Sequence, residues 1–158
     1  MVSEMIIYLM RHGKYVPKDV APERPLSEEG QHDVKRMAQC LKRYGINVDA
    51  ILHSGKTRAM ETASLMGETL NPGIIPRLEK GLSPMDDVDS IAGLINDCEE
   101  TLLIVGHLPH LGKLASLLIT GNASASIVNF QQGGVLCLQR VEQAGWAISW
   151  MLHPELIA

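Results

Sequence analysis

The sequence has little cysteine, with only three residues of this type among 158. Cys40, Cys98 and Cys137 are odd in number, lie far apart and have no short metal-ligand spacing. This pattern argues against a disulfide framework and against a zinc site. We therefore expect reduced cysteines, a cytoplasmic protein, and no metal or other cofactor.

Long hydrophobic runs are also missing. No segment approaches the roughly 18 consecutive apolar residues that a membrane helix needs. The N-terminus carries Glu4 and no basic lead before a long apolar run, so it lacks the layout of a secretory signal. The sequence therefore predicts no membrane association, and we expect the mature chain to begin where the sequence does.

An excess of positive charge is the third feature that the chain lacks. Lysine and arginine number 14 against 18 acidic residues, which gives a net charge of −4. Domains with a general nucleic-acid-binding surface are usually strongly basic, so we expect no nucleic-acid partner. Any functional cations must be concentrated locally.

The length and pattern of the chain favour one domain that spans 1–158. A chain of 158 residues corresponds to about one domain, and no linker or internal repeat divides it. Short apolar runs typical of buried strands alternate with helical periodicity. Strands are expected at 5–10, 50–54, around 74–75 and at 101–106, and helices at 27–45, 57–70, 88–95 and after Pro109.

The last part of the chain predicts a hairpin, with strands at 135–141 and 146–152 around Gln143-Ala144-Gly145. Strand–helix alternation followed by a hairpin predicts an α/β fold. The expected architecture is a three-layer α/β/α sandwich with a mostly parallel central sheet and an antiparallel edge.

Four residues of two types occur at strand ends or helix starts. Arg11 and His12 follow the first strand, Arg58 follows the second, and His107 follows the central one. In open α/β sheets the ligand crevice lies at the carboxyl ends of the strands, so these side chains are expected to meet there. Guanidinium groups and imidazoles around one point suit a tetrahedral phosphate and the transition state of phosphoryl transfer.

Within this set His12 is the better nucleophile, because Arg11 and Gly13 flank it in a tight anion-binding turn where the glycine lets the anion approach the backbone. A backbone carbonyl could hold its other ring N–H, although the sequence does not show which one. His107 would donate a hydrogen bond to a phosphate oxygen. Alternatively, Arg58 could be an exposed helix charge and His107 a satisfied structural histidine. A metal pair of His107 and His110 lacks a clear third ligand.

Together these segments resemble the histidine phosphatase superfamily, the group related to phosphoglycerate mutases, and most closely its small SixA-type phosphohistidine phosphatases. Four segments carry the resemblance: Leu9 to Gly13, Pro25 to Gly30, Ser54 to Thr62, and Val105 to His110. The resemblance implies that His12 becomes transiently phosphorylated and that Arg11, Arg58 and His107 complete the phosphate pocket.

At one position the chain departs from the family, which usually has Ser-Pro ahead of the second arginine where this chain has Ser54-Gly55. Relatives that act on phosphate esters use a carboxylate as general acid after the second helix. Glu79, Asp86 and Asp87 all compete for that role here. A phosphohistidine substrate would need no strong acid, because its leaving imidazole is protonated near neutral pH.

The leading hypothesis is a phosphohistidine phosphatase that works through a covalent phospho-His12 intermediate, with a phosphohistidine-bearing protein or a small phosphorylated compound as substrate. A broad-specificity phosphomonoesterase or a mutase-like enzyme is the alternative among enzymes. A non-catalytic phosphate-binding module is the alternative from another class. The sequence leaves the oligomeric state and the physiological partner open.

Overall fold

One six-stranded sheet organises the molecule. The computed structural model describes residues 5–142 and 145–157, and their strands lie in the order β3-β2-β4-β1-β5-β6. The strands β1, β2, β3 and β4 pair in parallel, whereas β5 pairs antiparallel with both β1 and β6. Their bounds are Ile6–Arg11 (β1), Ala50–His53 (β2), Arg77–Leu78 (β3), Leu102–Gly106 (β4), Val135–Val141 (β5) and Gly145–Leu152 (β6).

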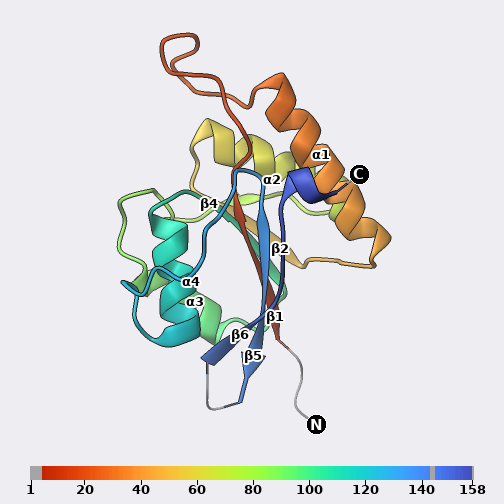
Figure 1. The fold of residues 1–158 in the computed structure, drawn as a ribbon. Coiled ribbons are helices and arrows are strands. Elements are labelled where there is room, and N and C mark those ends of the chain that lie inside the picture. Colours follow the sequence, from red (N-terminus) through yellow and green to blue (C-terminus); the bar gives the residue numbers. More distant parts are fainter. Residues whose placement is uncertain (1–4, 143–144, 158) are drawn as a thin grey trace.

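Helices cover both faces of this sheet (Figure 1). The helices α1 (Glu28–Arg43) and α2 (Thr57–Leu70) pack on one face, and α3 (Asp89–Asp97) and α4 (His110–Thr120) pack on the other. A short 3-10 helix, η1 (Pro154–Leu156), follows β6. The predicted three-layer sandwich with a mostly parallel sheet and an antiparallel edge is confirmed.

The central strand β1 shows why its sequence is continuously apolar. Ile7 and Leu9 point into the core beneath α3 and α4, while Tyr8 and Met10 point into the core beneath α1 and α2. A strand that is buried on both faces needs apolar side chains at every position. The apolar run therefore ends only at Arg11, the last residue of β1, where the strand leaves the core.

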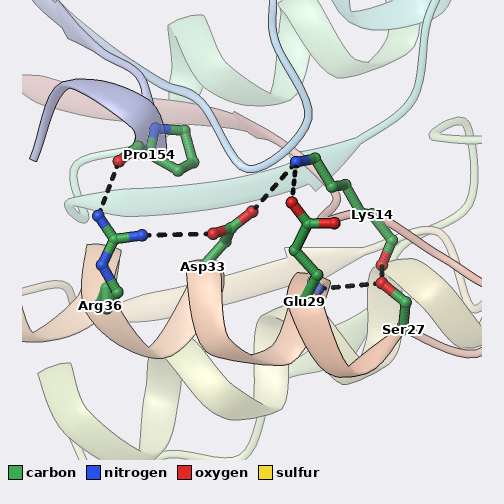
Figure 2. A network of polar contacts seen from close by, with 7 residues as sticks. Lys14, Ser27, Glu29, Asp33, Arg36 and Pro154 are labelled. Carbon is green, nitrogen blue, oxygen red and sulfur yellow. Dashed lines mark hydrogen bonds and ion pairs between the residues drawn. The ribbon is translucent and has the colours of Figure 1, made fainter.

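A polar network ties α1 to the two segments that flank it (Figure 2). The Ser27 side chain caps the helix by accepting a hydrogen bond from the Gly30 N–H at 3.0 Å. Further along α1, Arg36 donates to the backbone carbonyl of Pro154 at 3.0 Å and pairs with Asp33. Asp33 and Glu29 both face the ammonium group of Lys14. The network fastens the loop after β1 and the C-terminal segment to the same helix.

Two sequence predictions need comment. The extended piece predicted around Ile74-Ile75 is wrong by two residues, because the chain comes beside β2 only at Arg77 and Leu78. The hairpin of β5 and β6 is confirmed, while Gln143 and Ala144 of its turn lie outside the described residues. In the part of the chain that the structure describes, no helix is long and apolar enough to cross a membrane.

Candidate active site

The two central strands deliver two histidines to one place. Arg11 ends β1 directly beside Gly106, which ends the parallel strand β4, so His12 and His107 both follow at the same edge of the sheet. Their ring centroids are 4.9 Å apart. The backbone N–H of His12 donates to the carbonyl of Gly106 at 3.1 Å, which fixes this register one residue beyond the strands.

Two arginines lie near enough to His12 for their charges to lower its pKa. Arg58 comes from the first turn of α2, and its guanidinium carbon lies 5.1 Å from the ring centroid of Tyr15. The Tyr15 ring in turn stands edge-on to His12, with a centroid distance of 5.3 Å. The side chain of Arg11 donates from Nη1 to the Phe130 carbonyl at 3.0 Å.

Each arginine also keeps a buried Nε that has no hydrogen-bond partner within the described residues. Unpaired buried donors are costly, so they indicate a site shaped for an acceptor. The four residues expected to form a phosphate pocket (Arg11, His12, Arg58 and His107) are thus brought together by the structure.

One ring nitrogen of His12 is occupied and the other is free to react. The Nδ1 atom lies 2.9 Å from the carbonyl oxygen of Gly13, which accepts its hydrogen and so leaves the lone pair on Nε2. This identifies the carbonyl that the sequence left open. Burial, aided by the nearby charges of Arg58 and Arg11 and opposed by the hydrogen bond to the Gly13 carbonyl, lowers the pKa of His12 to about 4.

The second histidine, His107, is held by a hydrogen bond to Ser54. The Ser54 hydroxyl lies 2.6 Å from Nε2 of His107, and the buried Nδ1 of His107 has no partner in the described part of the chain. Burial, followed by the proximity of His12 and Arg58, lowers the pKa of His107 to about 3. At neutral pH this imidazole is therefore uncharged, and when Nε2 accepts from Ser54, its Nδ1–H is a free donor.

These low pKa values predict a measurable pH dependence of the free enzyme. In NMR titrations of ring C–H signals, His12 should stay neutral until the pH approaches about 4, and the Arg58→Gln variant should raise the pKa of His12 by removing a positive charge. Unfolded histidines take up protons near pH 6.5, so the free energy of unfolding should fall as the pH decreases from about 6.5 to 4. A His12 signal that titrates near 6.5 would contradict this.

Three polar residues of the site escaped the sequence analysis as functional positions. Ser54 orients His107, Tyr15 lies beside both Arg58 and His12, and the Thr62 hydroxyl accepts from the Gly13 N–H at 3.1 Å while donating to the carbonyl of Arg58 at 2.8 Å. The spacing of four residues between Arg58 and Thr62 in a helix was the available signal for the last of these.

The role predicted for Gly13 is wrong. Its backbone N–H donates to the Thr62 hydroxyl and is therefore not available to an anion. A Cβ at this position would lie 2.8 Å from Cγ2 of Val34 and 3.3 Å from the Gly30 carbonyl. The glycine is therefore required by close packing of the loop on α1.

Gly55 explains the departure from the Ser-Pro pattern. Its φ is 88°, a left-handed conformation that proline with its fixed φ near −65° cannot adopt. Its N–H also donates to Nδ1 of His53 at 3.0 Å. The turn between β2 and α2 thus has a different backbone from a Ser-Pro turn and still places Ser54 against His107.

We expect the Gly55→Ala variant to lose about 1–2 kcal/mol of folding stability, because alanine is strained at this φ and its Cβ would lie 2.5 Å from a Leu78 methyl group. The matched control is Gly45→Ala, which has a φ of 75° and no atom within 4 Å of an added Cβ. Urea denaturation of both variants measures the difference. Equal losses would show that Leu78 yields freely.

The competing carboxylates have different surroundings. Asp86 accepts from the Ser83 N–H at 2.9 Å, and Asp87 accepts from the Asp89 N–H at 2.8 Å, so both stabilise their own loop. Glu79 follows β3 and is half-buried beside the end of β2, where its N–H donates to the His53 carbonyl at 2.9 Å. Among the described residues its carboxylate makes no hydrogen bond. His110 is fully buried at the start of α4, next to the loop that carries Asp86.

Comparison with known proteins gives consistent results. The family model described as "Histidine phosphatase superfamily (branch 1)" matches residues 7–89. Phosphohistidine phosphatase SixA of Escherichia coli (strain K12) is 26% identical over 156 residues, which cover 95% of this chain and 94% of that protein. An uncharacterised protein of Picosynechococcus is 29% identical over 142 residues, or 85% of each chain.

Among solved structures, the histidine phosphatase SixA in complex with tungstate has a TM-score of 0.85 at 24% identity. The match covers 96% of this chain and 99% of that one. At this level of identity the structural comparison establishes a shared fold over almost the whole length of both proteins.

Proposed function

The chain belongs to the histidine phosphatase superfamily and is a phosphatase, and from this premise we propose that it hydrolyses phosphohistidine through a covalent phospho-His12 intermediate. We propose Arg11, Arg58 and His107 as the groups that bind and neutralise the phosphoryl oxygens. The observation that carries the proposal is the hydrogen bond from Nδ1 of His12 to the Gly13 carbonyl, which leaves Nε2 unprotonated in a pocket of cations.

The chemistry follows from these positions. The lone pair on Nε2 of His12 attacks phosphorus while the bond between phosphorus and the substrate nitrogen breaks, and the leaving imidazole takes up a proton from solvent. A water molecule then attacks the phosphorus of phospho-His12 as the bond from phosphorus to Nε2 breaks. The water returns one proton to solvent, and inorganic phosphate and the free histidine result. The negative charge on the equatorial oxygens lies near two guanidinium groups and the free N–H of His107, an arrangement that stabilises the transition state electrostatically.

Two features favour phosphohistidine over a phosphate ester. A leaving imidazole is protonated near neutral pH, so the reaction does not need a strong acid, and Asp86 and Asp87 are occupied by backbone donors. The connections from β2 to α2 and from β4 to α4, which carry Ser54 and His107, are short, whereas the loop after β1 stands away from the body of the molecule in Figure 1. Short connections at these two strand ends leave little chain for a lid, which suits a phosphoryl group carried on a protein. A protein of similar fold was solved with tungstate, a tetrahedral oxyanion, which supports a phosphoryl group as the ligand without distinguishing the two substrates.

The test combines substrate choice with trapping of the intermediate. A phosphohistidine peptide and a phosphoserine peptide of the same sequence are compared by kcat/KM, and we expect the first to be preferred by at least tenfold. Labelled enzyme is then denatured in alkaline detergent during turnover, with His12→Asn as control. Label that is stable to base, labile to acid and absent from the control is expected. Preference for phosphoserine would overturn the substrate assignment, and unlabelled active enzyme would overturn the intermediate.

A broad phosphomonoesterase or a mutase-like enzyme makes different predictions in the same assays. A phosphomonoesterase would hydrolyse the ester at least as fast, and a mutase would return the phosphoryl group to an acceptor instead of to water. The half-buried carboxylate of Glu79, which is free among the described residues, is the feature that favours ester hydrolysis. The non-catalytic phosphate-binding module is set aside, because members of this family are phosphatases.

A further inference from the structure

A second cationic hollow adjoins the site. It measures about 590 Å³ and is lined in part by Tyr15, Lys18, Arg24 and Gln132. Tyr15 belongs to both places, because its ring lies near His12 and Arg58 and its side chain also lines the hollow. The hollow therefore begins one aromatic ring away from the proposed phosphate pocket.

The free charge of this hollow is positive. Lys14 and Glu29 also line it, but they pair with each other at 2.6 Å and neutralise one another (Figure 2). Lys18 and Arg24 form no ion pair within the described residues. The chain as a whole is acidic, with a net charge of −4, so two unpaired cations beside a phosphate pocket are a local concentration of charge.

A neighbouring hollow, which shares Lys14, Glu29 and Gln132 with the first, is less cationic. Arg11 and Lys14 contribute to it, and so do three carboxylates, those of Glu29, Asp33 and Glu155. Glu29 pairs with Lys14, and Asp33 faces both Lys14 and Arg36, so nearby cations offset these two carboxylates, while Glu155 forms no ion pair within the described residues. The hollow lined by Lys18 and Arg24 is therefore the more cationic of the two.

Arg24 is held in place at a conformational cost. Its φ is 51°, in the left-handed region that disfavours residues other than glycine, and the following Pro25 further restricts its backbone. The N–H of Arg24 donates to the Ala21 carbonyl at 3.0 Å, and the pair Tyr15 and Leu26 closes the base of the loop. The guanidinium makes no hydrogen bond within the described residues, and it lies near enough to lower the pKa of Arg58.

We propose that this hollow binds an acidic side chain of the phosphorylated protein, with Arg24 and Lys18 holding the carboxylate while the phosphohistidine occupies the neighbouring pocket. The inference rests on the proposed function and adds sequence selectivity to it. An extended peptide spans about 3.3 Å per residue, so a glutamate one or two positions from the phosphohistidine reaches across the Tyr15 ring.

The test uses two phosphohistidine peptides that carry either glutamate or glutamine at the two positions on each side of the phosphohistidine. Wild-type enzyme should favour the glutamate peptide by about tenfold in kcat/KM, mainly through KM, and the preference should weaken at high salt because charge pairs are screened. Free phosphohistidine supplies the basal activity.

Arg24→Gly is the decisive variant, because glycine accepts the left-handed backbone and removes only the side chain. It should abolish the preference for glutamate while leaving the melting temperature and the turnover of free phosphohistidine within twofold of wild type. Arg24→Lys should restore part of the preference. Lys42→Gln is the matched control and should behave as wild type. Lys42 lies in the last turn of α1, about 20 Å along the helix from Glu29, which lines the hollow.

The outcomes separate the two proposals. Equal kcat/KM of wild type for the two peptides, or equal losses on both peptides in Arg24→Gly, would overturn the second site and leave the phosphatase assignment intact. Failure of wild type to hydrolyse either peptide would overturn the phosphohistidine assignment, and the carboxylate site in this form with it.

Discussion

Replacing His12 by asparagine should lower kcat/KM by about 10⁴-fold or more, because it removes the nucleophilic nitrogen. Asparagine is close in size to the inner part of the imidazole, and its amide can still donate to the Gly13 carbonyl that holds Nδ1 in the wild type. The phosphate pocket should therefore keep its shape. Initial rates on a phosphohistidine peptide, measured together with binding of inorganic phosphate, separate lost chemistry from lost binding.

Two variants serve as controls for this loss. His107→Asn removes a donor to the phosphoryl oxygens and should cost only about 10²–10³-fold, because its proposed role is electrostatic. His32→Asn changes an exposed histidine on α1 and should leave the rate unchanged. If His12→Asn keeps more than about 1% of wild-type activity, the covalent mechanism is wrong. If His107→Asn loses as much as His12→Asn, the two histidines have been assigned the wrong roles.

The position of His12 was predictable because it depends on where the buried parallel strands end. Apolar runs located β1 and β4, and the rule that parallel strands end at a common crevice placed His12 beside His107. The helices α1 and α2 were equally predictable, since helical periodicity is a local property of the chain. These features need no knowledge of tertiary contacts.

What could not be predicted depends on contacts between distant segments. The Ser54 hydroxyl lies against His107, which is 53 positions away, and Thr62 receives the N–H of Gly13 across 49 positions. Such pairs are set by how α2 packs beside the loop after β1, and no local pattern encodes that distance. For the same reason Gly13 was assigned to an anion when its neighbour is Val34.

Gly30 shows how much one such close approach contributes, and its replacement by alanine should cause the largest loss of stability predicted here. A Cβ on Gly30 would lie 2.0 Å from the carbonyl oxygen of Lys14 and 2.9 Å from its carbonyl carbon. Both atoms belong to backbone that cannot rotate away, since the Lys14 carbonyl accepts the Ser27 N–H at 3.0 Å. We expect a loss of about 3 kcal/mol or more, and a fall in melting temperature of roughly 10 °C.

The matched control is Gly93→Ala in α3, a helical glycine with open space around an added Cβ. Alanine is the better helix former, so this variant should gain about 0.5–1 kcal/mol. If the melting temperature of Gly30→Ala equals that of wild type, the loop after β1 can move away from α1 without a loss of stability. That loop carries His12, Tyr15 and Arg24. Gly30→Ala should therefore also bind phosphate more weakly than wild type at temperatures where it is still folded, because the packing of this glycine holds the geometry of the pocket.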